Sequence, residues 1–173
     1  MAYVWEKERI TIKLKGRKAE GDFLPLEIFD FPVEYISEDG RYYLLLLMDD
    51  EERGGEWWYV VETEPEVTLD YLEGKISVRD IFERGRVFIG FRNYEAYDII
   101  EDLEPLERNI EKGFIKKSDL PTCNARMDID EETLKEIKSL MRFTVSKEQE
   151  IIDRREFPEV EVNSPEAEVS LAA

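Results

Sequence analysis

The pattern of apolar and polar positions predicts a chain built mainly of β-strands. Ile10, Ile12 and Leu14 alternate with polar residues, and this period of two is typical of a half-buried strand. The run YYLLLLM at 42–48 is continuously apolar, which indicates a strand that is covered on both faces. A charged turn with two glycines separates it from EWWYVVE at 56–62, so the two runs are predicted to pair as a hairpin.

Helical spacing replaces the strand pattern in two places. At 68–85, Ser77 followed three residues later by Asp80 approximates a capping box, and Gly85 is expected to end the helix. The clearest helical pattern covers 128–143, where one face carries an apolar stripe. The stripe consists of Leu134, Ile137, Leu140 and Met141.

These patterns predict an α+β fold in which a mainly antiparallel sheet, arranged as a meander, carries short helices and a longer C-terminal helix on one face. We expect one domain over 1–155 and an acidic, disordered tail over 156–173, where prolines and acids accumulate and bases are absent. The predicted strands lie near 10–15, 26–36, 42–48, 56–62 and 86–91, and the predicted helices lie near 69–84 and 130–142.

Charge and composition limit the classes of partner and of chemistry that fit the chain. The chain of 173 residues has a formal net charge of −18, from 24 basic and 42 acidic residues. Such a surface repels phosphate backbones and anionic lipid, and it favours a basic protein partner. There is no histidine, which excludes Ser-His-Asp catalysis and zinc sites that contain histidine. With Cys123 as the single cysteine and no apolar leader or membrane-length segment, the sequence predicts a cytoplasmic protein without an internal disulfide.

The candidate partner-binding residues are two acidic clusters and two tryptophans. Trp57 and Trp58 are neighbours in a predicted strand and must point to opposite faces, so both cannot enter the same core. The second tryptophan either lies on another covered face of the sheet, which is the more common case, or serves as an anchor for a partner. The acidic clusters repeat carboxylates in a way that can imitate phosphates, although charge runs more often form a solvated face. Their candidate residues are Asp49, Asp50, Glu51, Glu52, Glu95, Asp98, Glu101 and Asp102.

Metal chemistry is the main alternative, and its motifs are incomplete. Asp128, Asp130 and Glu132 have the odd spacing of a calcium loop, but the turn glycine and the final glutamate are missing, and helix capping explains them better. Glu73-Gly74-Lys75 and Glu136-Ile137-Lys138 match only the Glu-x-Lys half of a metal nuclease site. We therefore predict no metal and no cofactor.

Direct nucleic-acid binding is a second alternative. The segment 7–18 is the one basic stretch of the chain, with Lys13, Lys15, Arg17 and Lys18 at its end. These bases are few against the total charge, and they are also suited to protecting an edge strand or to pairing with the protein's own acids.

The segment LDYLEGKISVRDIF at 69–82, preceded by the two apolar runs, resembles an uncharacterised family of small bacterial and phage proteins, a domain of unknown function. The shared features are LDYLEGKI followed by RDIF, and the resemblance covers about 22–105. It implies an α+β domain and a bacterial or phage source, and it carries no catalytic residues.

The sequence thus favours a non-enzymatic, acidic protein-binding module, a small cytoplasmic accessory or regulatory protein of phage–host conflict that binds a basic partner. Mimicry of nucleic acid toward a DNA- or RNA-binding protein is a refinement of this hypothesis. A metal-dependent nuclease or phosphohydrolase that uses clustered carboxylates, and a nucleic-acid binder that uses the 7–18 strand, remain the alternatives.

Overall fold

The computed structural model describes residues 6–29, 31–121, 131–132 and 134–141, with the backbone alone at 27–29 and 31. The predicted tail at 156–173 and Cys123 lie outside the described residues.

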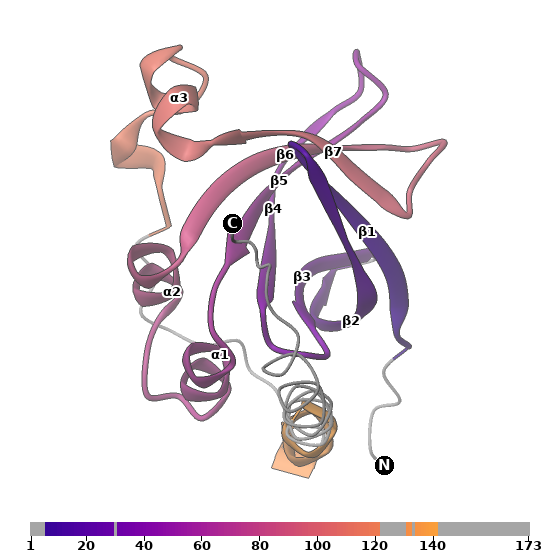
Figure 1. Ribbon diagram of the computed structural model, residues 1–173, viewed down its shortest axis with the longest axis vertical. Helices are drawn as coiled ribbons and strands as arrows, with labels where there is room; N and C mark the ends of the chain where they lie inside the picture. Colours follow the sequence, from indigo (N-terminus) through magenta and orange to yellow (C-terminus); the bar gives the residue numbers. More distant parts are fainter. Residues whose placement is uncertain (1–5, 30, 122–130, 133, 142–173) are drawn as a thin grey trace, which may run out of the picture.

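Seven strands in the described part of the chain form a closed barrel, in which each strand is hydrogen-bonded to the next along the sequence (Figure 1). Every consecutive pair is antiparallel. The strands are β1 (Glu8–Leu14), β2 (Arg17–Phe29), β3 (Phe31–Ser37), β4 (Tyr42–Asp50), β5 (Gly55–Glu62), β6 (Arg86–Asn93) and β7 (Ile99–Pro105).

The barrel closes through a parallel pair between β1 and β7. Strand direction alternates along the chain, so an odd number of strands leaves the first and the last running the same way. Thr11 lies opposite Ile99 and Ile12 opposite Ile100. The backbone N–H of Thr11 donates to the carbonyl of Asp98 at 2.8 Å. Closure removes the free edges that an open sheet would leave at β1 and β7.

The prediction of an open meander sheet of the α+β class under a longer helix is therefore wrong: the fold is mostly a closed barrel with few short helices. Two segments account for the difference. The predicted piece at 26–36 belongs to two strands, and β2 reaches back to Arg17. The strand β7 has the sequence IIEDLEP, and its three acids obscure any strand pattern.

The predicted helical region at 69–84 consists of two short helices, α1 (Pro65–Leu72) and α2 (Val78–Arg84). The capping box of α2 is confirmed, because Ser77 Oγ accepts from the backbone N–H of Asp80 and the Asp80 carboxylate accepts from the N–H of Ser77. Two further short helices are α3 (Leu106–Glu111) and the 3-10 helix η1 (Lys117–Asp119). Of the predicted helix at 130–142, residues 131–132 and 134–141 are helical and the others lie outside the described residues.

Side chains fill the barrel interior, with Trp58 as the largest of those that are fully buried. This inner cluster takes residues from six of the strands and consists of Ile10, Ile12, Leu14, Phe23, Tyr35, Tyr42, Leu44, Trp58, Val60 and Ile100. Alternate residues of the same strands point outward and build a second cluster. In that outer cluster Leu24, Ile36 and Tyr43 pack with residues of α1, α2 and the helix at 134–141.

The two clusters explain the apolar run of β4. Leu44 belongs to the inner cluster, whereas Tyr43 belongs to the outer one. The prediction that this run is covered on both faces is therefore confirmed for its first half. Beyond Leu44, Leu45 and Leu46 are only partly buried, and Met48 is exposed.

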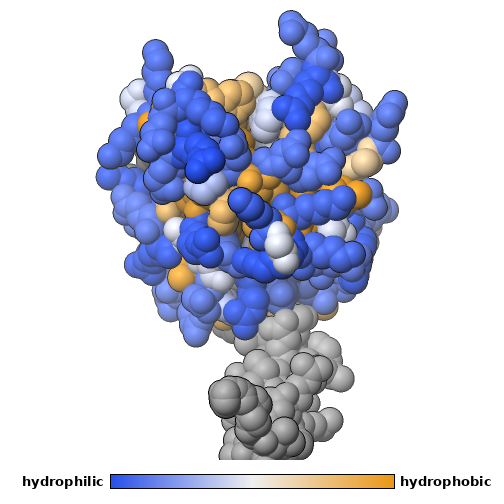
Figure 2. Space-filling view, turned by 45° about the horizontal axis from the view of Figure 1, so that its top comes forward, coloured by the Kyte–Doolittle hydropathy of each residue, from blue (hydrophilic) through white to orange (hydrophobic). Residues whose placement is uncertain are grey.

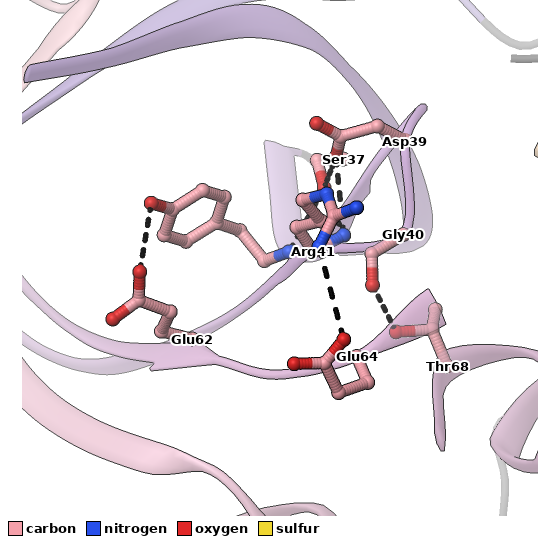
Figure 3. A network of polar contacts seen from close by, with 8 residues as sticks. Ser37, Asp39, Gly40, Arg41, Glu62, Glu64 and Thr68 are labelled. Atoms are coloured by element: carbon pink, nitrogen blue, oxygen red, sulfur yellow. Dashed lines mark hydrogen bonds and ion pairs between the residues drawn. The ribbon is translucent and has the colours of Figure 1, made fainter. Parts of the chain in front are cut away.

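The turn between β3 and β4 is fixed to α1, as Figure 3 shows. Gly40 has φ of 74°, a conformation that favours glycine, and its carbonyl accepts from Thr68 Oγ1 at 2.7 Å. Ser37 Oγ accepts from the backbone N–H of Arg41, and the Arg41 guanidinium lies 3.8 Å from the Glu64 carboxylate. This turn therefore ties the start of β4 to the helical layer.

Candidate protein-binding surface

The two predicted acidic clusters meet at one end of the barrel. The β4–β5 turn and the β6–β7 loop project from the same side of the molecule in Figure 1. The backbone N–H of Tyr94 donates to the carbonyl of Gly54 at 3.0 Å, and the Tyr94 hydroxyl donates to Asp49. The Arg53 guanidinium lies 2.8 Å from the Asp102 carboxylate. Acids that are far apart in the sequence are therefore held beside one another, and we call this region the acidic end.

Most carboxylates of the acidic end face solvent. Asp50 and Glu101 are half-buried, and the exposed ones are Asp49, Glu51, Glu52, Glu95, Asp98 and Asp102. Among the described residues, Glu51, Glu52, Glu95 and Asp98 make no ion pair. These four negative charges are therefore available to an incoming cation.

Hydrogen bonds fix the protonation of this end. The indole N–H of Trp57 donates to Asp50 at 3.0 Å and, with the backbone N–H of Arg53, lowers the pKa of that carboxyl. The hydrogen bond to Asp49 raises the pKa of the Tyr94 phenol to about 12. At neutral pH Asp50 is therefore an anion, while Tyr94 keeps its proton and donates it to Asp49.

The two tryptophans point to opposite faces of β5, as the strand period predicts. Trp58 is 0% exposed inside the barrel, where its N–H donates to Glu56 at 3.0 Å and its ring lies 5.5 Å from that of Tyr35. Its ring is out of reach of a partner in this structure. Trp57 lies on the outer face and is half-buried, so Trp57 takes the role of the candidate anchor.

Trp57 forms part of an aromatic group beside the acidic end. Its ring meets the edges of Phe91 and Phe114 at centroid distances of 5.0 Å and 5.1 Å. The Arg53 guanidinium stacks 4.9 Å from the Trp57 ring and 4.4 Å from the Phe91 ring. Phe114 is 38% exposed. Sequence reasoning missed Phe114, because a single phenylalanine outside the predicted strands and helices gives no periodic signal.

A groove of about 470 Å³ lies against this group, between the outer face of β5–β7 and α3. Its apolar lining comes from Trp57, Ile89, Leu103 and Phe114. Two ion pairs border it, Arg53 with Asp102 at 2.8 Å and Lys112 with Glu104 at 2.7 Å. Figure 2 looks onto this side and shows hydrophobic surface in the middle, bordered by hydrophilic side chains. We call this feature the Trp57 groove.

A buried ionic cluster lies inside the barrel, and no pattern in the sequence predicts it. Arg92 is fully buried and pairs with Glu8 at 3.1 Å, while its Nε donates to the carbonyl of Tyr97 at 2.6 Å. The guanidinium stacks 3.6 Å from the Tyr97 ring, and the Tyr35 hydroxyl donates to Glu8 at 2.6 Å. Each charge therefore has partners, so the cluster serves to hold β1 and β6 together.

The basic segment pairs with the protein's own acids. Lys7, Arg9, Lys13 and Arg17 lie within 4.0 Å of Glu38, Asp22, Glu101 and Glu62 respectively. Lys13 also lies opposite Lys18 in the β1–β2 ladder. Four of the six bases in the segment 7–18 are therefore paired with acids within the fold.

The motifs proposed for metal chemistry do not converge in the described residues. Glu73 pairs with Lys75 and Lys138, each at 3.3 Å, and the described residues hold no group of three acids or cysteines that could bind an ion. Asp128 and Asp130 lie outside the described part of the chain. No helix among the described residues has the length and hydrophobicity needed to cross a membrane.

Comparison with known proteins gives no relative from which a role can be transferred. No protein-family model matches the chain, and neither a curated protein nor a solved structure matches it.

Proposed function

We propose that the protein is a non-enzymatic binding module whose acidic end recognises a basic segment of another protein. The observation that carries the proposal is the junction of the β4–β5 turn with the β6–β7 loop beside the Trp57 groove. There, exposed carboxylates without ion pairs among the described residues lie in two joined loops, and the Arg53–Asp102 ion pair connects these loops to the apolar groove. Carboxylates around a half-buried tryptophan supply both the long-range attraction and the local anchor that protein interfaces use.

The charge of the whole chain supports the same partner. A net charge of −18 speeds the encounter with a cationic protein and slows the encounter with nucleic acid. A DNA- or RNA-binding protein is the refined form of the partner, since its basic groove is complementary to carboxylates presented from two loops. In that case the protein would act by occupying the nucleic-acid site.

The test is capture of partners by the tagged full chain from its host, with two charge-matched variants. In the loop variant, Glu51, Glu52 and Glu95 become Gln and Asp98 becomes Asn. The control variant changes four exposed acids of the helical side to Gln, namely Glu66, Glu83, Glu131 and Glu132. We expect a basic protein to be captured by the wild type and the control and lost by the loop variant. Equal capture by all three proteins would refute the role of the acidic end.

A further inference from the structure

The second half of β4 has an open side within the described residues. Its pairing with β3 is limited to Tyr43, Leu44 and Leu45. Its pairing with β5 continues to Asp50, which lies opposite Gly55. Within the described residues, the segment 46–50 is therefore paired on one side only, although the barrel as a whole is closed.

The cause of this opening is visible in the two strands. If the β3–β4 register continued beyond Glu34 and Leu45, Pro32 would lie opposite Leu47. Proline has no N–H to donate, and Leu47 is the extra residue where the β4–β5 register shifts. The N-terminal part of β3 instead pairs back onto β2, with Pro32 opposite Ile28. Alternate N–H and C=O groups of 46–50 are thus directed away from β5.

The first three residues of this open segment are apolar and at least partly exposed, which is unusual for a strand edge. Leu46 and Leu47 are half-buried, and Met48 is 38% exposed. Edges are ordinarily protected by lysine, proline or a covering element, because an apolar edge pairs with other chains. Here the carboxylates begin only after Met48, at Asp49. They mark the end of the open segment and leave its centre unprotected.

We infer that this open edge accepts an extended, cationic segment of the partner protein as an additional strand. The inference rests on the proposed function and names the recognition mode of the same surface. At about 3.3 Å per residue, the five positions 46–50 span roughly 17 Å, enough to pair a segment of about five residues. The backbone would supply hydrogen bonds, and side chains of alternating character would meet Met48 and the neighbouring carboxylates.

The carboxylates beside the open edge favour a basic segment over an acidic one. A strand laid along 46–50 ends beside Asp49, Glu51 and Glu52, so lysine or arginine in the partner is attracted at that end. A second copy of this chain is the less favourable occupant, because it would bring another net charge of −18 against the same hairpin. The edge is therefore suited to a heterologous basic strand.

The test uses the full chain and two labelled nine-residue peptides in which lysine and valine alternate. The second peptide is N-methylated at its five central residues, which blocks backbone pairing on both edges and keeps charge and side chains. We expect saturable binding of the first peptide and at least about tenfold weaker binding of the second, together with slower hydrogen exchange at 46–50. Equal binding of both peptides overturns strand addition and leaves electrostatic recognition by the acidic end intact.

Two matched variants sharpen the result. Met48→Lys places a cation on the open edge, and Leu140→Lys makes the same charge change at a residue of similar exposure, 37% against 38%. We expect Met48→Lys to lower the affinity for the unmethylated peptide several-fold. Leu140→Lys should leave that affinity unchanged. Strand addition is also overturned if no peptide binds up to about 1 mM, if protection falls on α3 instead of β4, or if the chain dimerises through this edge. The capture experiment above then decides separately whether the acidic end binds a partner.

Discussion

Arg53 and Asp102 form an ion pair of 2.8 Å that joins the β4–β5 turn to β7, across 49 positions of sequence. Asp102 has φ of 58°, in the left-handed region that few residues other than glycine, asparagine and aspartate adopt. The Arg53 guanidinium also stacks on the rings of Trp57 and Phe91. One side chain therefore links the two acidic segments to the Trp57 groove.

Replacing Arg53 by Gln should loosen the acidic end with little effect on global stability. Exposed ion pairs are worth about 0–1 kcal/mol, so we expect a change in the free energy of unfolding below about 1 kcal/mol. Hydrogen exchange should accelerate in the β4–β5 turn and the β6–β7 loop, because their cross-link is lost. Arg79→Gln, which breaks the exposed Arg79–Glu83 pair on α2, is the control and should leave both loops unchanged. Unaltered loop exchange in Arg53→Gln would contradict the linking role.

Removal of the hydroxyl group should change the stability of the fold differently at two buried tyrosines. Tyr71 donates to the buried Glu34 at 2.7 Å, so Tyr71→Phe should destabilise the fold by about 1–3 kcal/mol. The hydroxyl of Tyr59 is buried without a hydrogen-bond partner among the described residues. Tyr59→Phe should therefore be neutral or stabilising, because it removes a polar group that burial has desolvated. Urea unfolding of both variants checks the prediction, and a loss above about 1 kcal/mol in Tyr59→Phe would reveal a missing partner.

The fold should lose stability in alkali. Burial raises the pKa of Tyr59 and of Tyr97 to about 12, and it also raises the pKa of Tyr35 and Tyr43. In the unfolded chain these phenols ionise near pH 10, so the unfolded state releases protons first as the pH rises. The stabilisation is complete below about pH 10 and should decline as the pH rises from about 10 toward 12.

Urea midpoints measured between about pH 8 and pH 11.5 test this dependence. The Tyr59→Phe variant should show a shallower decline, since it lacks one of the shifted groups. A flat profile to pH 11.5 would mean that these phenols ionise alike in the folded and unfolded chains.

A methyl group at Gly90 should damage the barrel. Gly90 lies opposite Trp58, and a Cβ there would come within 2.7 Å of Ile100 Cγ2 and 2.9 Å of Leu103 Cδ1. Overpacking of this kind costs about 1–3 kcal/mol, so Gly90→Ala should lower the unfolding midpoint. Gly21→Ala is the matched control, because its added Cβ meets nothing within 4 Å. Equal stability of the two variants would show that the side chains around Trp58 can rearrange to accept the added methyl group.

The sequence was a good guide wherever a rule is local. The pair Ser77 and Asp80 predicts a capping box, and the period of two predicts that Trp57 and Trp58 face opposite ways. Both rules involve residues within a few positions of each other, so no knowledge of the topology is needed.

The remaining features depend on contacts between distant segments. Closure needs Thr11 beside Ile99, and no local pattern in the acidic β7 indicates that pairing. Arg92 in a strand is expected to face solvent, and only the barrel brings it to Glu8. The candidate acids were visible as clusters, but their meeting at one end depends on how the two loops are joined by Tyr94 and Arg53.

The central claim is that the acidic end binds a basic partner by charge, and a salt titration of that binding tests it most directly. The affinity of the captured partner would be measured for the wild type, the four-site loop variant and the helical-side control at several salt concentrations. Screening by salt should weaken wild-type and control binding steeply and alike, and the loop variant should bind more weakly with a shallower salt dependence. Binding by the loop variant that matches the wild type in strength and in salt dependence would contradict the account.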